Sequence, residues 1–298
     1  MLMALIALTL AGCGMSGNQD TPQGYVRHCV RILDSQALYA DTPQWSACKK
    51  ETLDAAKSFT TFDEAHEAIA AAAKVAGGKH STLSEPVRDT TTYQEIAPEA
   101  GMTEGDIVHI VLPAHSGVKV SDSLYVHSIL DFLQEHTNAK GVIVDLRGNR
   151  GGNMYPMIAA ISPLLPDGVI LRFKSRKRTS PVFLEAILQY QGLSGIKKLP
   201  SSTPVAILTD DWTASSGEAT LLCFRGLDNV RTFGIATAGY ASANVPYTLA
   251  DGYSLVVTAS CDVARTGEVF CDDPIAPDVE TETPLEEAIA WINTPTLQ

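Results

Sequence analysis

The sequence contains no apolar run long enough to span a lipid bilayer. Its most apolar stretch is the first twelve residues, MLMALIALTLAG, which as a helix would reach only about 18 Å of the ~30 Å hydrocarbon layer. Positive charge is also scarce, because 22 Lys and Arg residues stand against 34 Asp and Glu residues and give a formal net charge of −12. This charge repels nucleic acids, so we exclude them as partners.

The motifs that hold metals and nucleotides are missing as well. The six cysteines form no Cys-x-x-Cys pair, and no His-Glu-x-x-His sequence is present. The glycine-rich stretch at residues 148–153 has neither the Gly-x-Gly-x-x-Gly spacing of a dinucleotide site nor that of a P-loop. We therefore expect neither a metal nor a nucleotide cofactor.

The composition is that of a globular protein with a large core. The chain has 298 residues, of which 45% are hydrophobic and 19% are charged. This balance excludes a disordered polar chain and a collagen-like fibre. The length suggests two domains, or one large α/β domain with an appendage.

The N-terminus has the features of an export signal. The short apolar run ends in Leu10-Ala11-Gly12-Cys13, which resembles a bacterial lipobox. That resemblance implies a diacylglycerol on Cys13, with residues 1–24 as signal and tether. Because Gly14 is not the aspartate that retains lipoproteins at the inner membrane, a two-membrane bacterium would sort the protein to the outer membrane, facing the periplasm. The alternative is a buried N-terminal helix with an ordinary cysteine.

An exported protein permits disulfides, and five cysteines remain after Cys13. Short separations favour one pair between Cys29 and Cys48 and another between Cys261 and Cys271. The remaining cysteine, in the apolar helical stretch LLCF, would then stay free.

The periodicity changes along the chain. Residues 25–75 have helical spacing and predict an N-terminal helical cap, which ends at a glycine pair. From about residue 104, apolar strand-like runs alternate with helical ones, which predicts an α/β layer of buried, largely parallel strands within a core of residues 76–298. The dipeptide Asp251-Gly252 lies between two β-rich runs and predicts a hairpin. A final helix over PLEEAIAWI closes the chain.

Three loops concentrate reactive residues. In VAILTDDWTASSGEAT a buried strand leads into a helix, so that Ser215 or Ser216 would lie at a helix N-terminus, where free N–H groups favour developing negative charge. Glu218 could equally complete a capping box from Ser215. The loop VIVDLRGNRGGN offers Gly151 and Gly152, whose backbone can form either a turn or an oxyanion hole. The third loop, GGKHS, contains His80.

In this order the loops resemble the tail-specific, or C-terminal processing, serine peptidases. The resemblance covers roughly residues 76–282 and rests on GGKHS, VIVDLRGNRGGN, TASSGE, VRTFGIATAGY and PIAPDVE. It implies the family's α/β core, related to the crotonase and Clp-protease folds. A PDZ domain of the kind that many members insert has no room between His80 and Asp145. Tyr240 stands where the better-known branch has a catalytic lysine, so the pattern is similar to the tricorn and nisin-resistance branch.

The resemblance also implies roles for individual residues. Ser215 would be the nucleophile and His80 its general base, acting on a peptide or protein substrate without a cofactor. The N–H groups of Ser216 and of Gly151 or Gly152 would bind the oxyanion. The residue that orients His80 could be Glu218, Ser81 or Asp272. Two other functions remain open, which are a catalytically inactive member that binds a peptide or an apolar ligand, and an envelope scaffold.

Overall fold

The computed structural model describes residues 19–86, 94–103 and 105–294. These residues form two compact units. Unit 1 contains the described residues up to 86 together with 174–178 and 242–261, and unit 2 contains the others. Cys13 and the expected lipobox lie outside the described residues. Within the described ranges, none of the helices combines the length and the apolar character needed to cross a membrane.

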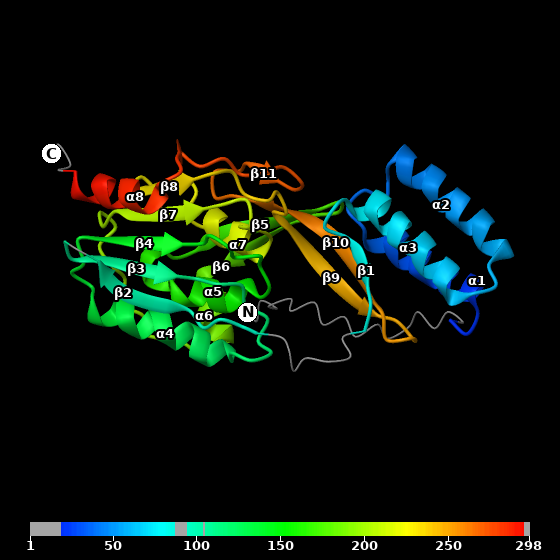
Figure 1. Cartoon of the computed structure of the whole chain (residues 1–298), viewed down its shortest axis with the longest axis horizontal. Coiled ribbons are helices and arrows are strands. Elements are labelled where there is room, and N and C mark those ends of the chain that lie inside the picture. Colours follow the sequence, from blue (N-terminus) through cyan, green and yellow to red (C-terminus); the bar gives the residue numbers. More distant parts are fainter. Residues whose placement is uncertain (1–18, 87–93, 104, 295–298) are drawn as a thin grey trace. The chain divides into compact units, whose positions relative to one another are not determined.

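Three helices form the N-terminal part of unit 1. Each begins at a threonine whose hydroxyl accepts a hydrogen bond from a backbone N–H in the first turn, which is the usual N-cap arrangement. The third helix ends where Gly78 adopts φ +82°. The helices α1 and α2 both contact α3 (Figure 1). They are α1 (Pro22–Gln36), α2 (Pro43–Ala55) and α3 (Phe62–Gly77).

The strands of unit 1 pack against these helices. The antiparallel pair β9 (Ser242–Thr248) and β10 (Ser254–Val263) forms a hairpin, and β1 (Thr82–Ser84) pairs with the other edge of β10. Gly252 takes φ +85° in the connecting turn, which confirms the hairpin predicted at Asp251-Gly252. One apolar core joins strands and helices, and it includes Tyr25, Leu33, Trp45, Ile69, Leu255 and Val257.

Unit 2 is built on a six-stranded sheet. The strand order is β12-β8-β7-β4-β3-β2, and every neighbouring pair is parallel except β2 with β3. This agrees with the predicted α/β class. The strands are β2 (Glu99–Thr103), β3 (Ile107–Val111), β4 (Gly141–Asp145), β7 (Val205–Thr209), β8 (Val230–Gly234) and β12 (Val279–Glu280).

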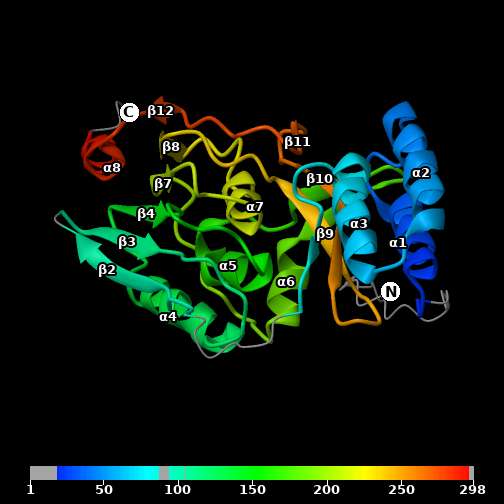
Figure 2. The same ribbon diagram turned by 45° about the vertical axis from the view of Figure 1, so that its right-hand side comes forward.

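Helices cover both faces of this sheet, which is why its central strands read as continuous apolar runs. Alternate residues of β4 point to opposite sides, since Val142 and Val144 join the larger core whereas Ile143 joins a smaller core with Ile292. Figure 2 shows α8 on one side of the sheet and α4 and α5 on the other. The covering helices are α4 (Asp122–Glu135), α5 (Met154–Ala160), α7 (Ser216–Leu222) and α8 (Pro284–Asn293).

The remaining elements connect these layers. The strands β5 and β10 each carry residues of both units. Sequence periodicity did not predict the short strand and helix that follow β5. These elements are β5 (Val169–Ser175), β6 (Thr179–Phe183), α6 (Leu184–Tyr190), β11 (Val269–Phe270) and the 3₁₀ turns Ala56–Ser58 and Ser162–Leu164.

The cysteines correct one prediction. Cys261 and Cys271 are disulfide-bonded, as their short separation suggests. Cys29 and Cys48, however, are free thiols, so the predicted bridge between them is wrong. Cys29 is buried in the helical core of unit 1, whereas the Cys48 sulfur lies 3.8 Å from the Thr52 hydroxyl one turn further along its own helix. The direction of a side chain on its helix, more than sequence separation, decides whether two thiols can meet.

Candidate active site

The carboxyl ends of three parallel strands bring the reactive loops of unit 2 to one edge of the sheet. The loop after β3 contains His115, the loop after β4 contains Gly151 and Gly152, and the loop after β7 leads to Ser215. Open α/β sheets bind ligands at this edge, because the loops that follow parallel strands meet there.

Ser215 has an unusual backbone conformation. It precedes α7 with φ +52° and ψ −116°, a region that non-glycine residues rarely enter. Two contacts with the loop after β4 hold this turn, since the Ala214 N–H donates to the Asn149 carbonyl at 2.9 Å and the Thr213 hydroxyl donates to the Leu146 carbonyl at 2.9 Å. The serine therefore stands on a sharp turn between a buried strand and a helix, where such strain is a feature of functional sites.

Glu218 holds the backbone around this serine. Its side chain is fully buried and accepts hydrogen bonds from the N–H groups of Ser215 at 2.9 Å, Gly239 at 2.9 Å and Tyr240 at 2.7 Å, and from the Thr237 hydroxyl. Burial raises the pKa of Glu218, and these four donors oppose that rise. The carboxylate thus joins the turn of Ser215 to the loop after β8. Glu218 therefore stabilises the backbone conformation at Ser215.

The glycine loop packs directly against Ser215. Gly151 and Gly152 have φ +96° and +115°, and a Cβ added to Gly151 would lie 2.7 Å from the Ser215 Cβ. The Gly151 N–H is occupied, because it donates to Asn149 Oδ1 at 2.9 Å. The N–H groups of Gly152 and Ser216 have no acceptor in the part of the chain that the structure describes. Of the two glycines that the sequence offers, Gly152 therefore has the available donor.

The hydroxyl of Ser216 links the two segments that carry the N–H groups of Gly152 and Ser216. It donates to the Gly152 carbonyl at 2.7 Å and so ties the start of α7 to the glycine loop. Asn149, which is fully buried, supports the same loop from the other side by donating to the Leu112 carbonyl at 2.8 Å. A single asparagine in a glycine-rich loop gave no indication in the sequence that it would support the loop.

His80 belongs to unit 1, where it follows α3. Its Nδ1 lies 2.9 Å from the hydroxyl oxygen of Ser242. Burial, followed by the positive charges of Lys74 and Lys79, lowers the pKa of His80 to about 4. The imidazole is therefore neutral at pH 7 and able to accept a proton. Sequence reasoning missed Ser242, because it lies 162 positions away from His80 and no spacing rule connects them.

The other two candidates for orienting His80 have different surroundings. The Ser81 hydroxyl donates to Thr258 Oγ1 at 3.0 Å and accepts from the Thr258 N–H at 2.9 Å, so it fastens the chain to β10. Asp272 lies in unit 2, directly after Cys271. Among the described residues, no three His, Cys, Asp or Glu side chains converge in a way that could hold a metal ion.

Comparisons with known proteins agree with this geometry. Residues 107–281 match the family model "Peptidase family S41". The chain is 36% identical over 281 residues to the nisin-resistance protein of Lactococcus lactis subsp. lactis, an alignment that covers 92% of this chain and 88% of the relative. A solved lipoprotein from Streptococcus agalactiae superposes with a TM-score of 0.80 at 31% identity, covering 91% of this chain and 96% of the other.

A more distant structure shares the fold. The photosystem II D1 C-terminal processing protease superposes with a TM-score of 0.62 over 92% of this chain and 97% of its own, at 11% identity. The family match spans the β3-to-β12 region that positions Ser215 and the glycine loop. The chain therefore belongs to peptidase family S41, and the protein is a serine peptidase.

Proposed function

We propose that the protein hydrolyses peptide bonds through an acyl-enzyme in which Ser215 is the nucleophile and His80 is the general base. The observation that carries this proposal is the turn at Ser215, where a strained serine lies beside two N–H groups, of Gly152 and Ser216, that find no acceptor among the described residues. Free N–H donors beside a nucleophile are what the negatively charged intermediate of acyl transfer needs.

The chain also connects the two members of the proposed pair. Glu218 accepts from the Ser215 N–H and from the Tyr240 N–H. Only Ala241 separates Tyr240 from Ser242, whose hydroxyl is the partner of His80 Nδ1. If Nδ1–H donates to Ser242, the Nε2 lone pair is left to accept the serine proton. We therefore propose Ser242 for the orienting role, in place of Glu218, Ser81 and Asp272, among which the sequence did not choose.

The proposed reaction has two half-reactions. His80 Nε2 takes the Ser215 hydroxyl proton while Oγ bonds to the peptide carbonyl carbon, whose π electrons move to the oxygen. Gly152 and Ser216 donate to that oxyanion, and each such donor is worth about a hundredfold in rate. The imidazolium then protonates the amine as the C–N bond breaks. Water, deprotonated by the same imidazole, finally releases the acyl group from Ser215.

The lowered pKa of His80 predicts an unusual pH dependence. The base works only when neutral, so we expect the rate of Ser215 labelling by a fluorophosphonate to fall as the pH drops through about 4. An unperturbed histidine would lose activity already near pH ~6.5. The measurement is the labelling rate of the wild-type protein between pH 3 and pH 8, with the site mapped by mass spectrometry.

Two variants make this test specific. His80→Ala should lower the labelling rate about a thousandfold and remove the acid limb, which is the fall in rate at low pH. Lys79→Gln removes one of the positive charges that lower the pKa of His80, so the limb should move to higher pH, whereas the exposed Lys57→Gln should leave it unchanged. Labelling of His80→Ala at the wild-type rate would exclude His80 as the base, whereas wild-type protein that is not labelled at Ser215 would favour a catalytically inactive binding protein.

We further propose that the enzyme acts in the cell envelope, held by a lipid on Cys13 to the periplasm-facing side of the outer membrane. The lipobox-like sequence and the similarity to a streptococcal lipoprotein support a lipid anchor in the cell envelope, and Gly14 after the cysteine favours the outer membrane in a bacterium that has two membranes. We expect Cys13→Ala to abolish incorporation of a fatty-acid analogue and to release the protein from the membrane fraction, while Cys48→Ala does neither. Incorporation that persists in Cys13→Ala would contradict the anchor.

A further inference from the structure

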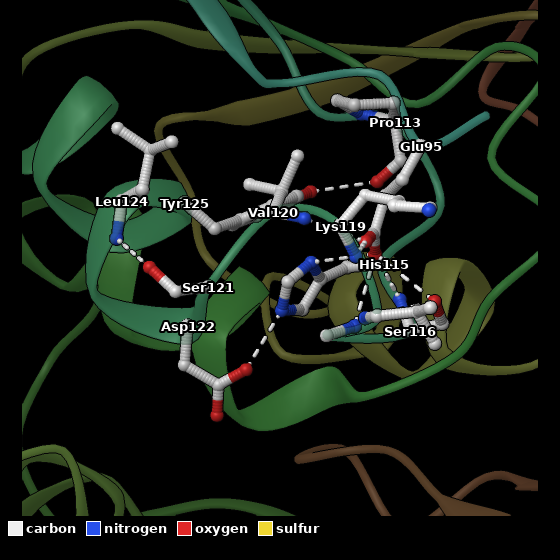
Figure 3. Close-up of polar contacts among 12 residues, drawn as sticks. Glu95, Pro113, His115, Ser116, Lys119, Val120, Ser121, Asp122, Leu124 and Tyr125 are labelled. Atoms are coloured by element: carbon white, nitrogen blue, oxygen red, sulfur yellow. Dashed lines mark hydrogen bonds and ion pairs between the residues drawn. The ribbon is translucent and has the colours of Figure 1, made fainter. Parts of the chain in front are cut away.

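A buried histidine that is not part of the proposed Ser215–His80 pair lies between two carboxylates in unit 2. The His115 side chain is fully buried, with Nδ1 3.1 Å from Glu95 Oε1 and Nε2 2.8 Å from Asp122 Oδ1 (Figure 3). The contact with Asp122 is a hydrogen bond, whereas that with Glu95 is an ion-pair distance without hydrogen-bond alignment. Both ring nitrogens therefore face negative oxygen atoms.

Glu95 is fixed as a carboxylate by the loop that follows His115. It accepts from the N–H groups of Ser116, Gly117 at 2.9 Å, Lys119 at 2.7 Å and Val120 at 2.8 Å. Burial raises the pKa of Glu95, but these backbone donors outweigh it and lower the pKa to about 2. A single glutamate thus closes the turn at residues 116–120 and presents an ionised oxygen to the imidazole.

Contacts on several sides hold the His115 ring. Nε2 is hydrogen-bonded to Asp122, and Nδ1 faces Glu95. Tyr125 covers the ring with its centroid 4.4 Å away, and its hydroxyl donates to the Pro113 carbonyl at 2.7 Å. The His115 ring is therefore in contact with Asp122, Glu95 and Tyr125.

The backbone of His115 supports the glycine loop. The His115 N–H donates to the Gly151 carbonyl at 3.1 Å, and the His115 carbonyl accepts from the Asn153 N–H at 2.7 Å. The two segments form a parallel β-bridge centred on Gly152. A Cβ added to Gly152 would collide with the His115 carbonyl oxygen. The position of residue 115 therefore fixes the orientation of the Gly152 peptide.

We infer that His115 is a positioning residue of the peptidase, whose buried side chain, held by Asp122, Glu95 and Tyr125, keeps the Gly152 N–H in place for the oxyanion. This inference rests on the proposed function, because it assigns a support to the donor used there. His115 touches no reacting atom and acts through the loop at residues 151–153. Electrostatic stabilisation depends on donors being fixed before the charge develops, so loosening this loop lowers the rate without abolishing binding.

His115→Gln tests the clamp, with His127→Gln as its matched control. His127 lies on α4 and has the same kind of partner, with Nδ1 3.1 Å from Asp131 Oδ1, but both side chains are about half exposed or more. We expect His115→Gln to lower the maximal rate of fluorophosphonate labelling at Ser215 by about ten- to a hundredfold while the concentration for half-maximal rate changes little. His127→Gln should retain both values.

A second readout does not depend on catalysis. Exchange of the Asn153 amide hydrogen reports the bond to the His115 carbonyl, and it should become at least about tenfold faster in His115→Gln and unchanged in His127→Gln. If His115→Gln does not fold, the same two measurements are made on Asp122→Asn, with Asp131→Asn as the control. We then expect a smaller decrease in labelling rate and a smaller increase in Asn153 exchange for Asp122→Asn.

The measurements distinguish failure of the proposed function from failure of the positioning role. Wild-type protein that is not labelled at Ser215 would overturn the proposed function, and the Asn153 exchange rates would then decide the clamp alone. Labelling and exchange rates of His115→Gln within twofold of wild type would overturn the positioning role. A rise in the half-maximal concentration with an unchanged maximal rate would also overturn it, because the residue would then serve binding.

Discussion

Replacing Ser215 with alanine should reduce hydrolysis of fluorogenic peptides by about a thousandfold or more and abolish fluorophosphonate labelling. The alanine keeps the N–H that Glu218 accepts at 2.9 Å, so the turn is retained while the attacking oxygen is lost. Alanine also fits the strained conformation no worse than serine, because both carry a Cβ. The measurement is the initial rate of hydrolysis at matched protein concentration and equal melting temperature.

The neighbouring serine is a matched control for this change. Ser216→Ala keeps the N–H group proposed for the oxyanion and loses only the hydroxyl bond to the Gly152 carbonyl. The expected loss is less than about tenfold, the scale of one hydrogen bond. Equal losses for the two variants, or a Ser215→Ala protein with wild-type activity, would refute the assignment of the nucleophile.

Replacing Gly152 with alanine should also nearly abolish activity, with a loss of about a hundredfold or more. The new Cβ would collide with the His115 carbonyl oxygen, which is backbone and cannot move aside alone. The φ of +115° adds strain for any residue with a Cβ. The collision and the backbone strain can be relieved only if the peptide of Gly152 rotates, and this rotation takes its N–H away from Ser215. The labelling rate at Ser215 measures this loss.

Gly148 provides the control within the same loop. It also has positive φ, at +72°, but a Cβ there would meet no heavy atom within 4 Å. Gly148→Ala therefore carries backbone strain of only about 1 kcal/mol, and activity should stay within about twofold of wild type. If both alanine variants were equally active, a fixed Gly152 donor would not be needed for the reaction.

The core of unit 2 could be predicted from the sequence because its strands are buried on both faces. Runs such as GVIVDL and VAILTD are apolar at every position, and β4 and β7 are buried throughout. The helical spacing of residues 25–75 likewise predicted α1, α2 and α3. By contrast, β12 has only two residues, and β6 has an exposed-to-intermediate pattern, so neither produces a periodic signal.

The surroundings of the site were harder to predict, because they depend on contacts between distant residues. TASSGE indicated Ser215 as a candidate nucleophile, yet nothing in its spacing indicated that Glu218 would bind the N–H groups of Gly239 and Tyr240. The clamp around His115 was missed for the same reason. Glu95 precedes it by 20 positions, and a histidine in a loop carries no signal of its partners. Topology brings such groups together, and a linear pattern cannot contain that information.

The segment from Thr237 to Ser242 has a consequence for changes in chain length. Glu218 binds three donors at its beginning, and Ser242 at its end contacts His80. One inserted or deleted residue next to Ala241 would change the length of chain between Tyr240, which Glu218 binds, and Ser242, which contacts His80, although every side chain needed for the chemistry would still be encoded. This short stretch, in which no residue is exposed, should therefore tolerate insertions and deletions poorly, unlike most surface loops of similar size.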